Sequence, residues 1–299
     1  MNPRNPDTVY VGTSGGGFFK STDTGATFQK MEKGLTRYNI TSVSVNPSIT
    51  TVIYAGSFGD SVYRSVDSGQ SWSVINRGLD DNVGTQAINA ISVDPFIADI
   101  IYIGTNHGVY KTTNGGSDWE SANMGIGNRF VIALTMDPEN HNLLLAGTHE
   151  GIFKTEDGAK TWRMPDPESK KWAVNAFAFN KTAPDTVYAG TNRGVLKSVD
   201  RGNSWEPKNE GITTRFIIAI AFHPENPQTL YVGNNDGVYR TADGGGAWTR
   251  LPTSPTGVTS LVFHMRSAQI LFAGTTHGLY QSTDEGAHWR QIKLPSSGS

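Results

Sequence analysis

The amino-acid sequence predicts an all-β fold, a seven-bladed β-propeller of four-stranded antiparallel blades. Two observations carry this prediction: an eight-residue motif that occurs seven times, and a spacing of 41 to 47 residues between successive copies. A repeat of this length is typical of a propeller blade. The third observation is a content of 34 glycines and 10% aromatic residues, which indicates many tight turns and short strands.

The repeated motif, or box, reads Ser/Thr-x-Asp-x-Gly-x-x-Trp, as in residues 65–72. Its Asp can accept hydrogen bonds from its own turn, its glycine allows a positive φ, and its Trp starts the next strand and buries a large ring. Calcium binding is the alternative, but a calcium loop needs alternating oxygen ligands and a distal glutamate, which the boxes lack. We therefore assign a structural role to the third residue of each box, which is Asp23, Asp67, Asn114, Asp157, Asp200, Asp243 or Asp284.

Four strands, A (inner) to D (outer), are predicted for each blade. Six segments that alternate small and large residues, such as 40–45, fit strand A; segments 53–56 and 109–111 exemplify strands B and C, and strand D begins at the Trp. The sequence contains seven sets of B, C and D segments but only six A segments. Asn2-Pro3 is in register with the residues that end an A segment in other blades. We therefore expect a first blade without its inner strand, in a chain trimmed at its N-terminus, with an unpaired edge near Val9–Gly12.

Composition and charge exclude several classes of protein. We expect one domain, residues 1–294, and a disordered or added tail over 295–299. The net charge of −2 gives no reason to expect nucleic acid, no apolar run is long enough to span a membrane, and the absence of cysteine excludes disulfides and thiolate chemistry. The first residues do not form a signal peptide, which fits a cytosolic protein or one whose export signal has been removed.

Together with the Val-Tyr-x-Gly-Thr-x-x-Gly-Val-Tyr-Lys-Ser pattern before the box, the motifs resemble those of the BNR/Asp-box repeat families over nearly the whole chain. The chain is most similar to the photosystem II stability/assembly factor family. It is more distantly similar to the sortilin ectodomain propeller, xyloglucan-cleaving glycosidases and sialidases. The resemblance implies a non-catalytic, often exported, extracytoplasmic protein that holds a partner protein on one face, without a cofactor. The motif specifies the fold more strongly than the function.

A candidate binding rim follows from the blade order, which places the D–A loops and B–C turns on the face opposite to the boxes. Four D–A loops end with a cation beside an aromatic residue, and these residue types are enriched at protein–protein hot spots. We expect an acidic or extended segment of another protein to bind there; alternatively, the rings plug the blade tops and the cations are solvated. The rim residues are Arg37, Tyr38, Arg129, Phe130, Lys171, Trp172, Arg193 and Arg215, with Lys170 beside them and with Asp80, Asp81, Glu150, Glu210 and Asp236 on the same face.

A carbohydrate-active propeller is the alternative function. Glycoside hydrolysis needs two carboxylates about 5–10 Å apart, whereas Glu150 and Asp236 belong to distant blades, and Asp80 and Asp81 lie on one loop. The rim offers three arginines for a sialidase, but the Arg-Ile-Pro motif of sialidases is missing. We therefore predict a protein without catalytic residues. A glycan partner, and a propeller engineered for folding studies, remain open interpretations.

Histidines offer a candidate zinc site. His107 and His277 occupy matching B–C turn positions, and His149 lies one residue earlier in its turn. Three histidines can bind zinc, but these belong to the third, seventh and fourth blades. We therefore expect solvated turn residues and no metal, and we expect His223 and His264 to be turn residues after strand A.

Overall fold

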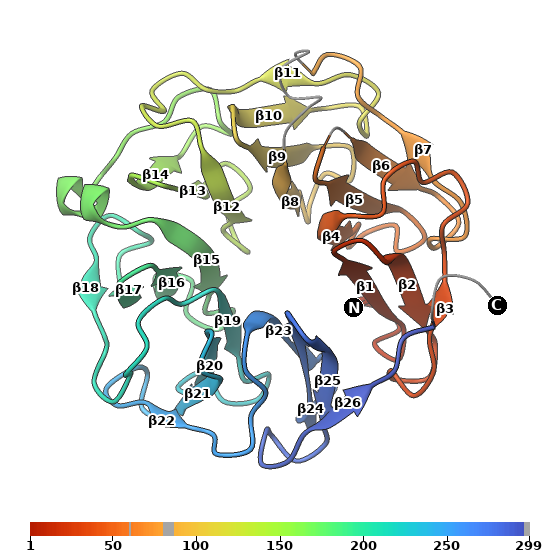
Figure 1. Cartoon of the computed structure of the whole chain (residues 1–299). Helices are drawn as coiled ribbons and strands as arrows, with labels where there is room; N and C mark the ends of the chain where they lie inside the picture. The colour runs from red at the N-terminus through yellow and green to blue at the C-terminus, as the bar shows by residue number, and fades with distance from the viewer. Residues whose placement is uncertain (60, 80–86, 296–299) are drawn as a thin grey trace. The chain divides into compact units, whose positions relative to one another are not determined.

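The computed structural model describes residues 1–59, 61–79 and 87–295, which form seven antiparallel sheets and a short 3-10 helix, η2 (Pro167–Lys171) (Figure 1). This arrangement confirms the predicted fold, an all-β, seven-bladed β-propeller. Asp80, Asp81 and residues 296–299 lie outside the described residues. Within the described part of the chain, no helix is long and apolar enough to cross a membrane.

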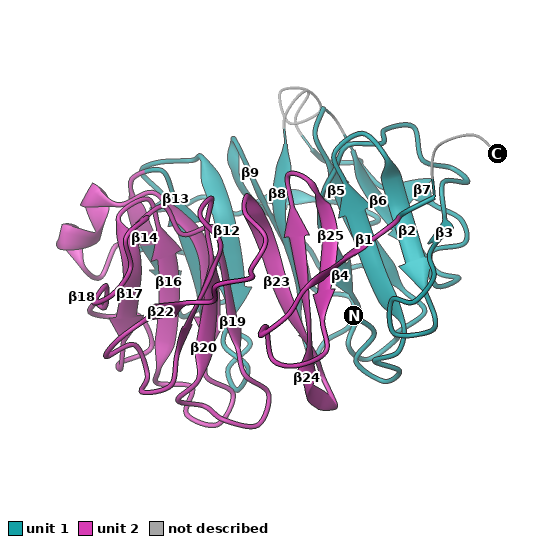
Figure 2. Ribbon diagram, turned by 60° about the horizontal axis from the view of Figure 1, so that its bottom comes forward, with its two compact units in different colours: residues 1–149, 153–163, 294–299 teal, residues 150–152, 164–293 magenta. Residues whose placement is uncertain are grey.

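The chain divides into two compact units (Figure 2). Unit 1 contains residues 1–149, 153–163 and 294–299, and unit 2 contains residues 150–152 and 164–293. The first three sheets belong to unit 1 and the last three to unit 2.

Strands A and B pair antiparallel at the inner side of each complete sheet, where strand A is the edge strand. A bulge follows the first residue of most A strands, for example between Ile40 and Ser42. Strand A is β4 (Ile40–Val45), β8 (Ile88–Val93), β12 (Val131–Met136), β15 (Val174–Phe179), β19 (Ala219–Phe222) and β23 (Val258–His264). Strand B is β1 (Val9–Thr13), β5 (Ile53–Ser57), β9 (Ile101–Thr105), β13 (Leu144–Thr148), β16 (Val187–Thr191), β20 (Leu230–Gly233) and β24 (Ser267–Thr275).

Strands C and D complete the sheets, and the boxes connect them. Strand C is β2 (Gly17–Ser21), β6 (Val62–Ser65), β10 (Gly108–Thr112), β14 (Gly151–Thr155), β17 (Gly194–Ser198), β21 (Val238–Thr241) and β25 (Gly278–Ser282). The shorter strand D is β3 (Gln29–Lys30), β7 (Ser73–Val74), β11 (Glu120–Ser121), β18 (Glu206–Pro207), β22 (Thr249–Arg250) and β26 (Arg290–Ile292).

Two sheets have three strands. The first, β1-β2-β3, has no inner strand, as predicted. The fourth, β12-β13-β14, departs from the four-stranded prediction because its outer strand is reduced to a single bridge between Lys154 and Arg163. In the third sheet, Ala122 lies three residues after the box Trp, and its N–H donates to Val109 O. The corresponding residue of the fourth sheet is Pro165, which has no N–H, so the ladder ends there.

The hydrophobic core lies in layers between neighbouring sheets. In unit 1, Phe18 of the first sheet packs with Ile53 and Trp72 of the second. In unit 2, Val195 packs with Leu230 and Trp248 of the next sheet. Because each sheet buries both faces, strand B carries large apolar residues on both sides, and this explains its unbroken apolar sequence.

Buried tyrosines of strand B connect neighbouring sheets within each unit. The Tyr54 and Tyr102 hydroxyls donate to carbonyls of the next box, at 3.3 Å from Gly115 O and 3.2 Å from Gly158 O. In unit 2, the Tyr188 hydroxyl is 2.7 Å from the oxygen of its equivalent acceptor. Burial raises the pKa of Tyr102 and of Tyr188 to about 12, so both remain neutral donors at physiological pH.

Candidate functional site

The box carboxylates are hydrogen-bonded within their own turns. In the first box, Asp23 Oδ1 accepts from Ser21 Oγ at 2.7 Å and from Thr27 N at 2.9 Å, and Asp23 Oδ2 accepts from Thr27 Oγ1 at 2.6 Å. The contact from the first Ser or Thr to the Asp or Asn Oδ1 recurs in the other six boxes. The next residue, Thr24, donates its N–H to Asp7 O in the A–B turn of the same sheet. The side-chain contacts stabilise the C–D turn, and the backbone hydrogen bond attaches this turn to the segment before strand B.

The same hydrogen bonds favour the ionised carboxylate. The hydroxyl and the N–H of Thr27 lower the pKa of Asp23 to about 2. In the second box, partial burial opposes this effect, but hydrogen bonds from Ser71 and Ser65 outweigh it and the pKa of Asp67 is also about 2. The boxes therefore carry fixed negative charge across the physiological pH range.

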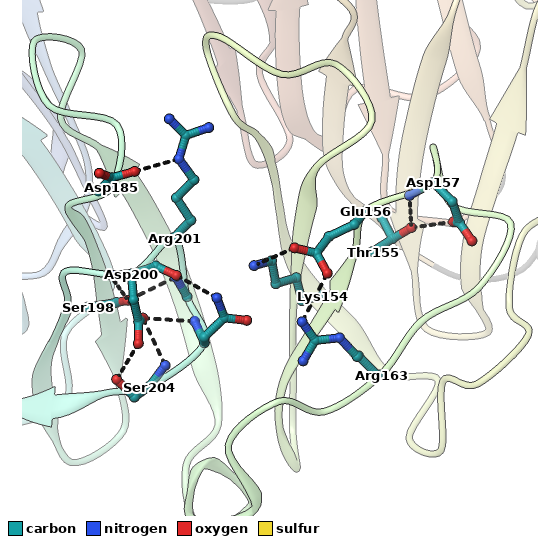
Figure 3. Close-up of polar contacts among 12 residues, drawn as sticks. Lys154, Thr155, Glu156, Asp157, Arg163, Asp185, Ser198, Asp200, Arg201 and Ser204 are labelled. Atoms are coloured by element: carbon teal, nitrogen blue, oxygen red, sulfur yellow. Dashed lines mark hydrogen bonds and ion pairs between the residues drawn. The ribbon is translucent and has the colours of Figure 1, made fainter.

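The fourth box borders a cavity of about 180 Å³, which is lined by Lys154, Glu156, Asp157, Thr161, Trp162 and Arg163. Lys154 is 1% exposed, and its Nζ lies 3.0 Å from Glu156 Oε1, while an Arg163 nitrogen lies 2.9 Å from Glu156 Oε2 (Figure 3). Hydrogen bonds from Arg163 and Lys154 lower the pKa of Glu156. The two cations are balanced by two carboxylates, those of Glu156 and Asp157, so the lining of the cavity carries no net charge.

The fifth box, in unit 2, shows the ordinary pattern (Figure 3). Asp200 accepts from Ser198 and Ser204 at 2.7 and 2.6 Å. Arg201, at positive φ, pairs with Asp185 of its A–B turn at 2.6 Å. The charged side chains of this box are therefore held by contacts within their own sheet.

The first predicted rim pair, Arg37 and Tyr38, lies against the B–C turn of the first sheet. The Tyr38 carbonyl accepts from Gly15 N at 3.1 Å and from Gly17 N at 2.8 Å. The Tyr38 ring is 43% exposed, and Lys30 Nζ lies 5.3 Å from its centroid. The D–A loop and the B–C turn therefore meet here and present an aromatic ring with a cation on it.

The second pair, Arg129 and Phe130, is held by a three-residue turn in which Val131 N donates to Arg129 O at 3.0 Å. The central residue of this turn, Phe130, is half-buried and stacks on His149 of the B–C turn with ring centroids 4.0 Å apart and an interplanar angle of 19°. Arg129 is exposed. His149, a zinc candidate in the sequence, thus contacts an aromatic ring.

Unit 2 carries the other predicted rim residues. The same three-residue turn recurs at Arg215, whose carbonyl accepts from Ile217 N at 3.0 Å, and the central Phe216 is 46% exposed. Arg193 is exposed in its B–C turn. Lys171 differs, because it ends η2 and pairs with Glu168, while Trp172 caps the helix and is half-buried.

The other titratable candidates have structural contacts. Asp236 Oδ2 accepts from the Tyr239 hydroxyl at 2.8 Å and lies 3.3 Å from Arg250 Nε. His107 and His277 donate their backbone N–H groups to threonines of their own turns. Within the described residues, no three His, Cys, Asp or Glu side chains are grouped so that they could hold a metal ion. Glu150 and Glu210 are exposed.

Phe58 is a surface residue that the sequence pattern does not single out. It lies in the B–C turn of the second sheet, is 56% exposed, and donates its N–H to Asn39 O beside Tyr38. The other B–C turns carry no aromatic residue at this place, so a search for recurrent pairs passes over it.

Solved structures share the fold. The GH74 xyloglucanase from Xanthomonas campestris matches with a TM-score of 0.80 and 14% identity, covering 98% of this chain and 54% of that chain. The GH74 enzyme from Niastella koreensis matches with a TM-score of 0.81 and 17% identity, covering 97% of this chain and 52% of that chain. The chain thus spans about half the length of these enzymes.

A structure of YCF48 bound to D1 peptide matches with a TM-score of 0.65 and 17% identity, covering 96% of this chain and 90% of that chain. The structure of YCF48 from Cyanidioschyzon merolae matches with a TM-score of 0.64 and 18% identity, covering 94% of this chain and 90% of that chain. At these identities the likeness shows the fold alone.

No curated protein sequence matches the chain. A family model does: the model described as Sortilin-Vps10 (Sortilin, neurotensin receptor 3) matches residues 60–188 and 193–298. This match spans most of the sequence and agrees with the propeller fold and with the Asp-box repeats. The chain therefore belongs to the Sortilin-Vps10 family.

Proposed function

We propose that this protein is a non-catalytic binding protein, which docks an acidic, extended segment of a partner protein on the D–A loops and B–C turns of unit 1. The observation that carries the proposal is the pairing of aromatic rings with cations on these loops: the exposed Tyr38 beside Arg37 and Lys30, and the half-buried Phe130 beside the exposed Arg129. The structure of YCF48 bound to D1 peptide supports the proposal, because that chain is of nearly the same length, shares the fold and binds a peptide.

The local backbone explains why these rings suit binding. Tyr38 is fixed by two hydrogen bonds to its carbonyl, and Phe130 by the turn below it and by His149 beside it. Rigid rings supply contact area at a low cost in conformational entropy. Arginines next to them would accelerate encounter with an acidic segment and make binding depend on salt.

The residues Lys171, Trp172, Arg193 and Arg215 of unit 2 remain predicted binding residues. Lys171 is the weakest of them, because Glu168 already pairs with its ammonium group. Arg215 is the strongest, because its turn repeats that of Arg129 and its neighbour Phe216 is exposed.

An array of acidic twelve-residue peptides would test the proposal. We expect binding that weakens as the salt concentration rises, and we expect the double variant Arg37→Glu with Arg129→Glu to lose most of it while its melting temperature is unchanged. The matched control is Lys160→Glu with Lys181→Glu, an equal change of charge at exposed cations of a box and an A–B turn. Equal binding by both double variants would refute the proposal.

The second candidate function is glycan binding or hydrolysis, which the GH74 matches favour. Exposed rings also stack on sugars. Against hydrolysis, Asp236 is held by Tyr239 and Arg250. Xyloglucan oligosaccharides placed on the same array distinguish the two functions, because their binding should not depend on salt.

A further inference from the structure

The third box contains the one Asn-Gly sequence of the chain, Asn114-Gly115, whereas the other six boxes have an Asp at the place of Asn114. An asparagine that precedes a glycine is prone to spontaneous deamidation, because glycine has no side chain that would hinder attack by its own amide nitrogen. The third box is therefore the only box whose third residue can lose an amide group.

Deamidation at this position needs no reactant except water. The Gly115 nitrogen forms a bond to Asn114 Cγ and gives up its proton, the bond between Cγ and Nδ2 breaks, and the amide group leaves as ammonia. The succinimide ring that results takes up water at one of its two carbonyl groups and opens. The product is aspartate or isoaspartate. Both add a negative charge, and isoaspartate also lengthens the main chain.

The folded box holds the attacking nitrogen in another contact. Gly115 is buried at a φ of +69°, and its N–H donates to Asp99 O in the A–B turn of the same sheet at 3.0 Å. An amide nitrogen must lose its proton in order to attack, and a hydrogen bond to a carbonyl keeps the proton in place. The closed turn therefore makes Gly115 N a poor nucleophile.

The side-chain amide is held as well. Asn114 Oδ1 accepts from Thr112 Oγ1 at 2.8 Å and from Asp118 N at 2.9 Å. Asn114 Nδ2 donates to Asp118 Oδ2 at 3.1 Å. The amide carbon between these atoms has to move onto Gly115 N to close the ring, and this movement disrupts the three contacts. Reaction therefore requires a local opening of the C–D turn, which proteins undergo without global unfolding.

The products do not fit the closed box. A hydrogen bond from Arg77, together with one from Asn114, lowers the pKa of Asp118, so this carboxylate is ionised at physiological pH. After deamidation, Asp118 loses the Nδ2 donor and lies beside a second carboxylate. Because ammonia has left, the amide cannot form again, and the change is permanent.

We propose that Asn114 is a modification site, at which spontaneous deamidation is suppressed by the closed third box and occurs when the C–D turn opens. The modified turn no longer closes as before, so the reaction permanently marks the molecules that have opened here. The site belongs to the box turns and does not depend on the loops of the proposed function.

Fragmentation mass spectrometry, which locates the modified residue, measures the rate in the intact protein and in a peptide of residues 112–119 at neutral pH. We expect Asn114 to react at least tenfold more slowly in the folded protein, because only the open turn reacts. In urea the rate should rise to that of the peptide. Equal rates in folded protein and peptide, or no reaction in urea, would overturn the proposal.

A substitution that the other boxes allow removes the reaction and keeps the turn. Ser68 occupies the place of Gly115 in the second box at a φ of +61°. A Cβ at Gly115 would lie 3.2 Å from Asp99 Oδ1, and in the first box Thr24 Oγ1 donates to Asp7 Oδ1 at 2.8 Å. Gly115→Ser should therefore keep the wild-type melting temperature and react at least tenfold more slowly in urea. An unchanged rate in urea would contradict attack by this nitrogen.

A matched pair of variants tests whether local opening controls the rate. Thr112 Oγ1 donates to Asn114 and accepts from Gly116 N, and Ser65 Oγ makes the same two contacts in the second box. Thr112→Ala should accelerate deamidation of Asn114 at least tenfold, and Ser65→Ala should leave it unchanged. Equal acceleration by both variants would assign the reaction to global unfolding and overturn the proposal.

The modified protein tests the consequence. Anion exchange separates deamidated from unreacted molecules by their added negative charge, and mass spectrometry selects the fraction modified at Asn114. We expect this fraction to melt at a lower temperature than the unreacted protein. An identical melting temperature would show that the turn closes around the product, and the proposal would then fail.

Discussion

At the scale of single residues, the third box exchanges the chemical roles of two positions. In the first box the acid is Asp23 and the donor is Thr27, whereas in the third box Asn114 Nδ2 donates to Asp118 Oδ2 at 3.1 Å. Arg77 pairs with Asp118 from the preceding D–A loop at 2.5 Å. The amide at position 114 is therefore matched to the carboxylate at position 118.

We accordingly expect Asn114→Asp to lower the melting temperature, although Asp stands at this place in the other boxes. The substitution places two carboxylates side by side. The double variant Asn114→Asp with Asp118→Thr should recover the loss, because it recreates the pair of the first box. Thermal unfolding at pH 7 measures both effects, and an unaltered melting temperature of the single variant would contradict the explanation.

The box tryptophans differ in their ring N–H groups. Trp119 Nε1 donates to Ile75 O at 2.7 Å, whereas Trp205 Nε1 is buried without a partner among the described residues. An unsatisfied buried donor costs about 1–3 kcal/mol. Trp205→Phe should therefore destabilise the protein less than Trp119→Phe, and urea unfolding compares them. Trp205→Ala should cost about 3–5 kcal/mol, the usual result of truncating a buried aromatic ring.

At the scale of elements, a glycine in the D–A loop allows this loop to lie against the box Trp of the next sheet. Gly78 has a φ of +88°, and a Cβ there would lie 2.2 Å from Trp119 O. The N–H of Trp119 donates to the preceding loop residue, Arg77. The same close approach occurs at Gly34, Gly125 and Gly211.

The two costs of replacing such a glycine can be separated. Gly78→Ala combines a positive φ with a steric clash, whereas Gly15→Ala meets the same φ of +90° in open space. A left-handed conformation alone costs about 1–2 kcal/mol. We expect Gly15→Ala to lose about that amount of unfolding free energy, and Gly78→Ala to lose clearly more. Similar losses for both would mean that the loop moves away without cost.

At the scale of the whole molecule, the box carboxylates make stability depend on acid. The pKa values of Asp23, Asp67, Asp157 and Asp284 are about 2, against about 3.9 for an unfolded aspartate. Between these values the unfolded chain binds more protons than the folded one. The stabilisation is therefore complete above about pH 4 and is lost as the pH falls toward about 2.

Urea unfolding measured from pH 5 to pH 2 should show this loss. The variant Asp23→Asn with Asp284→Asn should have a smaller slope of unfolding free energy against pH, because two of the groups no longer titrate. An identical slope would show that other carboxylates control acid unfolding.

The sequence by itself determines the seven sheets, the three-stranded first blade and the box turns. These features depend on local signals: alternation within a strand, a glycine at positive φ, and an Asp next to its own hydrogen-bond donors. The exposure of Phe58 and the absence of a partner for Trp205 Nε1 depend on residues of other turns or sheets. Only the tertiary structure decided them, because a repeat fixes what each blade contains and the packing of neighbouring loops fixes which side chains remain available.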